Sequence, residues 1–323
     1  MDRPLRIAAV GFWHVHGDDY ARAARTHPAT DLVAVWDDDD ERRADAASRW
    51  DVEPVADLAL LLARDDIDGV TITTATADHD SVIAAALEAG KHVFTEKVLS
   101  PTVDGAERLV ALAADRGLAL SVSLPRLFEG PFLTIRRLQR DGVFGQTVYA
   151  RVRLAHDGTV AGWLPARFHD PATAVGGVFF DLGCHPAYLV QQLLGSRPAT
   201  VRTVQGFVTA QALDDNTTVL LGYADGSIGV AEASSVTVPG AFAIELRGTR
   251  GSALYGFGGE RLLVKGDDFA GDDWVELALD ADSPTAFDRW VSRMLGEPVE
   301  DPTAEAAIEL TRLLVAAESA ARD

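Results

Sequence analysis

An aspartate and a histidine four residues apart, Asp181 and His185, are side chains whose types and spacing could do chemistry. On a helix this spacing puts both side chains on one face. A carboxylate bonded to one imidazole nitrogen fixes the tautomer of the ring and leaves the other nitrogen able to take a proton. The pair therefore suits removal of a hydroxyl proton. The alternative is a helix-terminal aspartate beside a structural histidine.

A second candidate site is the segment Val10 to Gly17, VGFWHVHG, which lies between a predicted strand and a predicted helix. A dinucleotide-binding loop belongs at such a junction, and its fingerprint asks for glycines at positions 11, 13 and 16. Gly11 is present, Trp13 and His16 occupy the other two positions, and Gly17 comes one place late. Taken alone, the loop fits a strand–helix turn without a ligand equally well.

Asp37 follows the second predicted strand and stands 26 residues after Gly11. A carboxylate at that place accepts hydrogen bonds from the adenosine ribose hydroxyls and repels a 2′-phosphate. We therefore expect NAD in preference to NADP, although Arg42 and Arg43 could reach a phosphate. The alternative for Asp37 is an N-cap of the following helix.

His14 and His16 form an H-x-H pair in the candidate loop. A metal site needs three or four ligands, and the sequence shows no third ligand nearby. We therefore expect no metal.

The elements that must position these residues fall into two groups. Up to Leu124, short apolar runs alternate with helical patterns, which predicts a doubly wound parallel sheet; the expected strands are 5–10, 31–36, 68–74, 91–95 and 118–124. After Leu124, a helical pattern over 177–194 precedes several period-2 segments joined by turn residues, which predicts an open, mainly antiparallel sheet. We expect a dinucleotide-binding Rossmann domain over 1–124 and a second, α+β domain over 125–323.

Composition excludes several classes of function. Of the 323 residues, 29 are Lys or Arg and 49 are Asp or Glu, a formal charge of −20. This balance argues against binding to nucleic acid or to anionic membranes. No apolar run is long enough to span a bilayer, and no secretory pattern is present. The one cysteine, Cys184, fits a reducing compartment, so we expect a cytoplasmic protein.

Three stretches make the chain resemble the Gfo/Idh/MocA oxidoreductases, the family of glucose–fructose oxidoreductase and inositol dehydrogenase. They are Ala84–Lys97 (AAALEAGKHVFTEK), Gly176–His185 (GGVFFDLGCH) and Ile244–Ser252 (IELRGTRGS). The resemblance implies that Lys97 lies between the nicotinamide and the substrate hydroxyl, where a cation stabilises oxyanion character. It also implies that His185 is the catalytic base and Asp181 its partner or a substrate ligand.

The resemblance places further residues in the site. We expect the cofactor to contact Gly11, Phe12, Trp13, His14, Asp37, Thr74, Ala75, His79, Glu96 and Lys97. We expect Arg126, Trp163, Arg167 and Tyr188 on the substrate side. The resemblance implies that residues 125–323 form a substrate-binding and oligomerisation domain, which builds a homodimer or homotetramer. It also implies that the last helix, 303–321, packs back on the first domain.

The sequence departs from the family pattern at three positions. Val98 stands where the family commonly has proline after Glu-Lys, and Ala75 changes the loop after the fourth strand. Tyr188 replaces an aspartate that could hold polyol hydroxyls, which puts an inositol-like substrate in doubt.

The expected function is NAD-dependent hydride transfer between nicotinamide and a secondary alcohol or carbonyl of a sugar, sugar acid or cyclitol. One alternative is redox-neutral, NAD-assisted glycoside cleavage or epimerisation, which would release almost no NADH. The other is a non-catalytic dinucleotide or sugar sensor, favoured by Trp13 and His16 in the loop and opposed by Lys97, Asp181 and His185.

Overall fold

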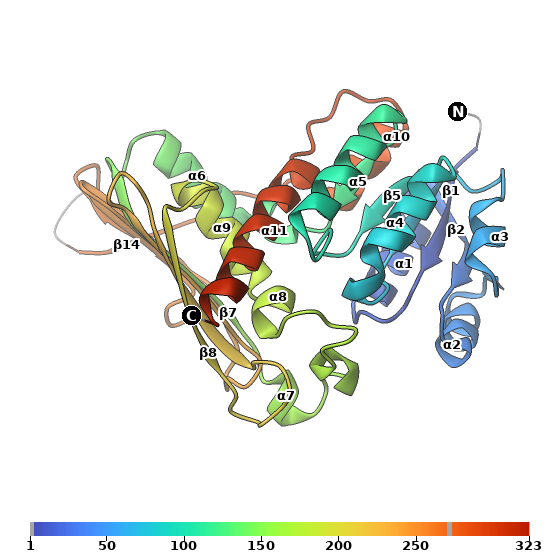
Figure 1. The fold of residues 1–323 in the computed structure, drawn as a ribbon. Helices are drawn as coiled ribbons and strands as arrows, with labels where there is room; N and C mark the ends of the chain where they lie inside the picture. The colour runs from blue at the N-terminus through green and yellow to red at the C-terminus, as the bar shows by residue number, and fades with distance from the viewer. Residues whose placement is uncertain (1–2, 270–272, 323) are drawn as a thin grey trace. The chain divides into compact units, whose positions relative to one another are not determined.

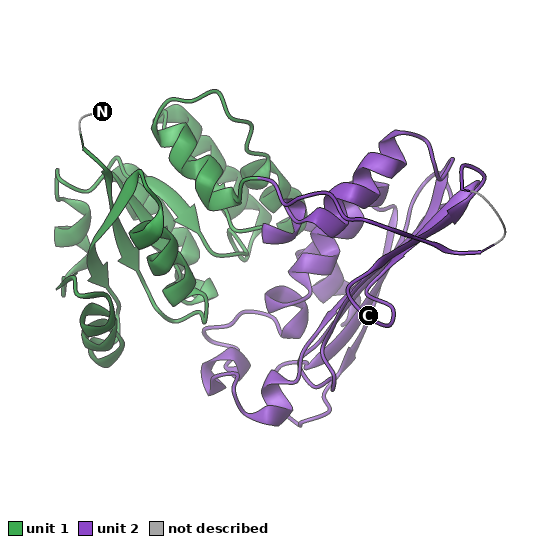
Figure 2. Ribbon diagram, turned by 180° about the vertical axis from the view of Figure 1, so that it is seen from behind, with its two compact units in different colours: residues 1–124, 284–311 green, residues 125–283, 312–323 purple. Residues whose placement is uncertain are grey.

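A computed structural model describes residues 3–269 and 273–322 and divides the chain into two compact units (Figures 1 and 2). The first unit, Met1–Leu124 with Pro284–Thr311, is built on a six-stranded parallel sheet. Its strand order, β3-β2-β1-β4-β5-β6, is that of a doubly wound dinucleotide-binding fold. The strands are β1 (Leu5–Val10), β2 (Thr30–Trp36), β3 (Glu53–Pro54), β4 (Gly69–Ile72), β5 (His92–Thr95) and β6 (Leu120–Val122).

Several helices of the first unit, α2, α3, α5 and α10 among them, begin at a side chain that caps them. Asp39 caps α2 by accepting hydrogen bonds from the backbone N–H groups of Glu41 and Arg42, and Thr102 caps α5. The interpretation of Asp37 as the N-cap is therefore wrong, because Asp39 takes that place. The helices are α1 (Gly17–Thr26), α2 (Asp40–Trp50), α3 (Leu58–Leu62), η1 (Thr76–Asp78), α4 (His79–Glu88), α5 (Val103–Asp115), α10 (Ala286–Met294) and the start of α11 (Thr303–Ala320).

A late segment of the chain completes the first unit. Trp290 of α10 is fully buried, packs with Phe94 and Phe287, and donates a hydrogen bond from Nε1 to the carbonyl of Ala119 at 3.2 Å. A Cβ on Gly69 of β4 would lie 2.9 Å from the Trp290 ring, so only glycine fits there. Residues 284–311, which we expected in the second domain, thus belong to the first unit.

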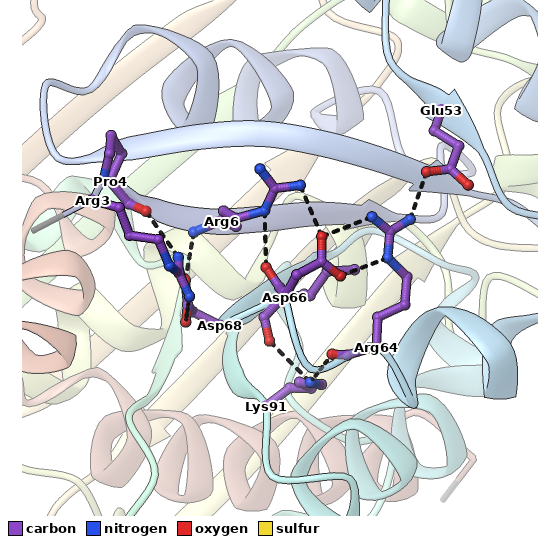
Figure 3. Close-up of polar contacts among 9 residues, drawn as sticks. Arg3, Pro4, Arg6, Glu53, Arg64, Asp66, Asp68 and Lys91 are labelled. Atoms are coloured by element: carbon purple, nitrogen blue, oxygen red, sulfur yellow. Dashed lines mark hydrogen bonds and ion pairs between the residues drawn. The ribbon is translucent and has the colours of Figure 1, made fainter.

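A charged network joins segments at the amino-terminal ends of the strands (Figure 3). Asp68 accepts hydrogen bonds from the Arg3 guanidinium and the Arg6 backbone, and Asp66 accepts them from Arg6 and Arg64. The Arg64 guanidinium lowers the pKa of Asp66. Lys91, just before β5, donates to the carbonyls of Arg64 and Ile67 at 2.6 and 2.9 Å. These contacts hold β1, β4 and β5 at the edge opposite the candidate site.

The second unit, Pro125–Ser283 with Arg312–Asp323, is an eight-stranded sheet with helices. The strand order is β14-β13-β12-β11-β7-β10-β9-β8, and all neighbours are antiparallel except β7 and β10. The strands are β7 (Thr147–Ala155), β8 (Thr200–Gly206), β9 (Asn216–Gly222), β10 (Ile228–Ser234), β11 (Ala241–Gly248), β12 (Gly251–Tyr255), β13 (Leu262–Gly266) and β14 (Val275–Leu277). The predicted fold class, a Rossmann sheet plus an open and mainly antiparallel one, is confirmed.

Helix α9 covers one face of this sheet, where a Cβ on Gly229 of β10 would lie 2.6 Å from Val190. The opposite face exposes apolar side chains such as Val204, Leu220 and Ile228. The helices of this unit are η2 (Pro125–Leu127), α6 (Gly130–Arg140), α7 (Gly158–Ala161), η3 (Ala166–His169), α8 (Val178–Asp181), α9 (Cys184–Leu194) and the end of α11. Within the described residues, no helix combines the length and apolar character that crossing a membrane requires.

Candidate cofactor and catalytic site

The loop after β1 lies against the loop after β4, at the carboxyl edge of the parallel sheet. Gly11 has a φ of 85°, and a Cβ on it would lie 2.6 Å from the backbone nitrogen of Thr74. Only glycine meets both conditions. The Thr73 hydroxyl donates to the carbonyl of Gly11, and the backbone N–H of His14 donates to the carbonyl of Thr73 at 3.0 Å. The sheet order reverses between β1 and β4, where ligands bind in this fold.

Gly17 provides the close packing that the fingerprint assigns to its last glycine. It is the first residue of α1, and a Cβ there would lie 3.0 Å from the Phe12 ring and 3.1 Å from the Thr73 hydroxyl oxygen. The altered loop therefore keeps its glycine at the start of the helix, one residue later than the fingerprint states. Trp13 and His14 are both buried.

Asp37 is fully buried and holds the loop together. Its Oδ2 accepts a hydrogen bond from the Phe12 backbone at 2.6 Å, and its Oδ1 accepts one from the Asp39 backbone at 2.8 Å. Arg42 donates to Oδ1 from Nε and Nη2 at 3.0 and 2.7 Å. The role of Asp37 as ribose ligand stays a prediction. Arg42, the possible phosphate ligand, already pairs with Asp37 and with its exposed neighbour Asp38.

Glu96 and Lys97 follow β5 directly, and both side chains are almost completely buried. Lys97 Nζ lies 3.4 Å from Glu96 Oε1 and 3.4 Å from His14 Nε2. The Tyr20 hydroxyl donates to Glu96 Oε2, and His16 Nδ1 lies 3.2 Å from the same oxygen. Burial alone would raise the pKa of Glu96, but His14, His16 and Lys97 together bring this pKa well below its usual range. Glu96 is therefore a charged carboxylate that faces Lys97.

The reasoning that left His14 and His16 without a third metal ligand is wrong. Glu96, 80 residues further along the chain, is brought beside them by the parallel sheet. One ligand atom from each of His14, His16 and Glu96 lies within 4.8 Å of the others. The H-x-H spacing was the only sequence signal of this cluster. Nothing in the sequence indicated that Tyr20 would contact Glu96.

The loop after β4 leads into His79, the first residue of α4. His79 Nδ1 lies 2.6 Å from the carbonyl oxygen of Val98, and because a carbonyl only accepts, Nδ1 carries the proton. His79 Nε2 and the Thr74 hydroxyl are buried polar atoms without a hydrogen-bond partner within the described protein. Such atoms at the carboxyl edge fit polar groups of a bound dinucleotide. The peptide bond between Lys97 and Val98 is cis.

The single helix predicted over 177–194 is wrong. Helix α8 ends at Asp181 and α9 begins at Cys184. A Cβ on Gly183 would lie 2.7 Å from the Phe179 carbonyl oxygen, so the glycine permits a tight break that the apolar pattern hides. The argument that placed Asp181 and His185 on one helix face therefore does not apply.

Tyr188 is a hydrogen-bond partner of His185, and the pairing of His185 with Asp181 stays a prediction. The His185 ring is buried, and its Nδ1 lies 3.0 Å from the hydroxyl oxygen of Tyr188. The same oxygen accepts a hydrogen bond from the Arg126 backbone at 3.1 Å. Tyr188, expected on the substrate side, is itself almost fully buried, and burial raises its pKa well above the usual range. It is therefore a neutral hydroxyl that orients His185.

The other expected substrate residues lie in the second unit. The Arg126 guanidinium lies 4.2 Å from the centre of the Phe242 ring and bonds Glu129 at 2.7 Å. Trp163 is half exposed and donates to Asp157 at 2.9 Å. Arg167 is a residue of η3. Their contacts with a substrate remain predictions.

The fold and the loop after β1 define a dinucleotide-binding protein with a second, sheet-based domain. Residues 5–124 match a family model described as an oxidoreductase family with an NAD-binding Rossmann fold, and residues 132–254 match the Gfo/Idh/MocA C-terminal domain. The chain belongs to the Gfo/Idh/MocA family of oxidoreductases.

The individual relatives share between 21% and 33% of their residues with this chain over the matched parts. A dTDP-3,4-didehydro-2,6-dideoxy-alpha-D-glucose 3-reductase of Streptomyces antibioticus is 33% identical over 59% of this chain, and the match covers only 57% of that relative. The structure of a 3-ketoreductase from Actinomadura kijaniata, solved with NADP and TDP-benzene, is 21% identical and has a TM-score of 0.84 over 98% of both chains. An inositol dehydrogenase homolog from Azotobacter vinelandii, solved with NAD+, is 23% identical and has a TM-score of 0.83 over 100% of this chain and 96% of that one.

Proposed function

We propose that the protein is an NAD-dependent oxidoreductase that interconverts a secondary alcohol and a carbonyl on a sugar, sugar acid or cyclitol. The observation that carries the proposal is the buried Glu96–Lys97 pair at the carboxyl end of β5, beside the Gly11 loop. A buried ammonium at that edge is suited to an oxygen that gains negative charge during the reaction. The relatives named above act on a nucleotide-linked keto sugar or are named for inositol.

The bound dinucleotide would supply the nicotinamide carbon that accepts or gives the hydride. Gly11, Thr74 and His79 would hold it, because Gly11 permits a close backbone approach and the other two offer unpaired buried polar atoms. We assign proton transfer with the substrate hydroxyl to His185. Its Nδ1 lies 3.0 Å from the Tyr188 hydroxyl, a contact that orients the ring, and we assign the proton transfer to Nε2. Lys97, held by Glu96, would stabilise the oxyanion.

The proposed roles are tested by Lys97→Met and His185→Asn. Each variant is expected to lower turnover by about two to four orders of magnitude, the usual contribution of an acid–base or oxyanion-stabilising group. Stabilisation of the fold by NAD should remain within a few-fold of the original, because the roles concern the transition state. Near-normal turnover in both variants would overturn the assignment. Stoichiometric NADH release in the oxidative direction would support net oxidation.

We further propose a homodimer or homotetramer that uses the uncovered face of the second sheet. Leu220 of β9 pairs in register with Val230 of β10, and both point to the face opposite α9. Val204 and Ile228 add exposed apolar area to the same face. Leu220→Asp should lower the mass measured by light scattering, whereas Leu60→Asp, on an exposed part of the first unit, should not. An unchanged mass for Leu220→Asp would argue against this face.

We propose a cytoplasmic location, in line with the single cysteine, which is buried. Fractionation of the source cells with an antibody against the protein would test it.

A further inference from the structure

We propose that His14, His16 and Glu96 form a binding site for a divalent transition-metal ion such as Zn2+, and that this ion competes with the ammonium of Lys97. One ligand atom from each of the three residues lies within 4.8 Å of the others. All three residues belong to the first unit. The inference concerns inhibition by a metal and does not depend on the identity of the substrate.

The donor set fits the chemistry of zinc. Two imidazole nitrogens and one carboxylate oxygen are a known ligand set of zinc sites that keep a fourth position open for water. Mg2+ and Ca2+ prefer oxygen ligands throughout. Glu96 Oε1 is buried and accepts no hydrogen bond within the described protein, so this oxygen can accept a metal ion at little cost in lost hydrogen bonds.

The three ligand side chains must move closer together to bind a metal ion, and they differ in how far they can move. Ligands at 2.0–2.1 Å around a tetrahedral zinc lie about 3.4 Å apart, so the 4.8 Å spread of the ligand atoms must contract by about 1.4 Å. His14 and Glu96 are buried and held by their neighbours, whereas the side chain of His16 is 38% exposed. His16 therefore offers both the movement and a route for the ion from solvent. The Tyr20 hydroxyl, bonded to Oε2, orients the Glu96 carboxylate.

The ammonium of Lys97 opposes binding of a metal ion at this site. Its Nζ lies 3.4 Å from both His14 Nε2 and Glu96 Oε1, so the ammonium already neutralises the carboxylate that the metal would bind. Two cations in a buried space repel each other strongly. A bound ion must therefore displace the Lys97 ammonium from its place between Glu96 and His14. This displacement moves away the cation on which the proposed reaction depends, so the metal-loaded protein should be inactive.

The test is a Co2+ titration of protein stripped with a chelator, followed by visible absorption, with Zn2+ added afterwards to displace the Co2+. We expect one saturable site per chain and no competition from Mg2+. His16→Ala and Glu96→Gln should each weaken Co2+ binding roughly tenfold or more. Lys97→Met should bind Co2+ several-fold more tightly. His27→Ala is the matched control, because this partly exposed histidine of the first unit lies outside the cluster.

The outcomes separate the two parts of the inference. Equal Co2+ affinity in His16→Ala and the original protein, or no saturable binding, would overturn the metal site. An unchanged Co2+ affinity in Lys97→Met would overturn the proposed competition between the metal ion and the Lys97 ammonium. Thermal unfolding of each variant checks that it is folded. Full turnover in chelator would leave the oxidoreductase proposal intact whatever the metal result, and inactivity in chelator would count against that proposal alone.

Discussion

The guanidinium of Arg42 holds the fully buried carboxylate of Asp37 through two hydrogen bonds, from Nε at 3.0 Å and from Nη2 at 2.7 Å. The other carboxylate oxygen accepts the backbone N–H of Phe12 at 2.6 Å. This pair joins helix α2, the end of β2 and the loop after β1. Asp37, which the sequence predicts to bind the cofactor ribose, thus also connects three segments of the first unit.

Arg42→Leu should destabilise the protein, because it leaves the Asp37 carboxylate buried without its counter-charge. Breaking a fully buried pair costs about 3–5 kcal/mol, and Arg42 is about a quarter exposed, so we expect a loss of about 2 kcal/mol in urea unfolding. Arg43→Leu is the control. Arg43 bonds the Asp37 carbonyl and the exposed Asp40, and its loss should cost less than about 1 kcal/mol. Equal losses in both variants would contradict the argument.

The cofactor preference can be read from thermal unfolding. A ligand at about a hundred times its dissociation constant stabilises the folded state by about 2.7 kcal/mol. We expect NAD to raise the unfolding midpoint at concentrations where NADP does not, because Asp37, Asp38 and Asp39 repel a 2′-phosphate. Asp38→Asn removes one charge and one partner of Arg42, and it should tighten NADP binding several-fold with little change for NAD. Tighter binding of NADP by the original protein would overturn the argument from Asp37.

Two glycines with similar backbone angles should respond differently to alanine. Gly11 has a φ of 85° and Gly90 a φ of 77°. A Cβ on Gly11 would lie 2.6 Å from the Thr74 backbone, whereas a Cβ on Gly90 meets nothing within 4 Å. Gly90→Ala should lower the free energy of unfolding only by the penalty for alanine in the left-handed conformation, about 1–2 kcal/mol. Gly11→Ala should cost more and abolish the stabilisation by NAD. Equal costs in urea unfolding would show that the Thr74 contact is unimportant.

The sequence predicted the elements that local patterns specify. Apolar runs and helical spacing indicated the parallel sheet, and the Gly11 loop and the Glu96–Lys97 pair were placed correctly at the ends of β1 and β5. Residues brought together from distant parts of the chain were missed, because periodicity carries no information on them. The contact of Glu96 with His16, across 80 residues, is one such case.

Two other differences have causes that the apolar pattern does not show. Gly183 permits the break between α8 and α9, although the residues around it keep a helical apolar spacing. Helix α10 has an ordinary amphipathic sequence, and its place in the first unit is set by tertiary contacts of Trp290 with Gly69, Phe94 and Ala119. The contact of the Tyr188 hydroxyl with His185 was not predicted either, because it depends on how the side chains pack.

Tyr188→Phe should lower the turnover number about tenfold, because His185 loses the hydroxyl that orients its ring. KM and the stabilisation by NAD should change little, since the hydroxyl is buried and the cofactor loop belongs to the other unit. Steady-state kinetics separates these effects. Tyr149→Phe, on the uncovered face of the second sheet, is the control. A rise in KM without a fall in turnover would place Tyr188 in substrate binding instead.

The stability of the protein should fall as the pH decreases through the range just below 6.5. Burial lowers the pKa of His79 from its ordinary value of 6.5, and His14 acts in the same direction, while the Val98 carbonyl and Glu96 oppose it. Burial also lowers the pKa of His92. Between the folded and the unfolded pKa the unfolded chain binds more protons, so the free energy of unfolding decreases with falling pH.

His79→Asn isolates the contribution of one ring, because the asparagine amide can still donate to the Val98 carbonyl. The low pKa of Glu96 lies below its ordinary value of 4.5, so its effect belongs to a more acidic range and does not overlap. Urea unfolding roughly one pH unit above and one below 6.5 should show a smaller loss in His79→Asn than in the original protein. His27→Asn is the control, since this ring is partly exposed. A loss of equal size in His79→Asn would mean that His79 does not bind a proton on unfolding in this range.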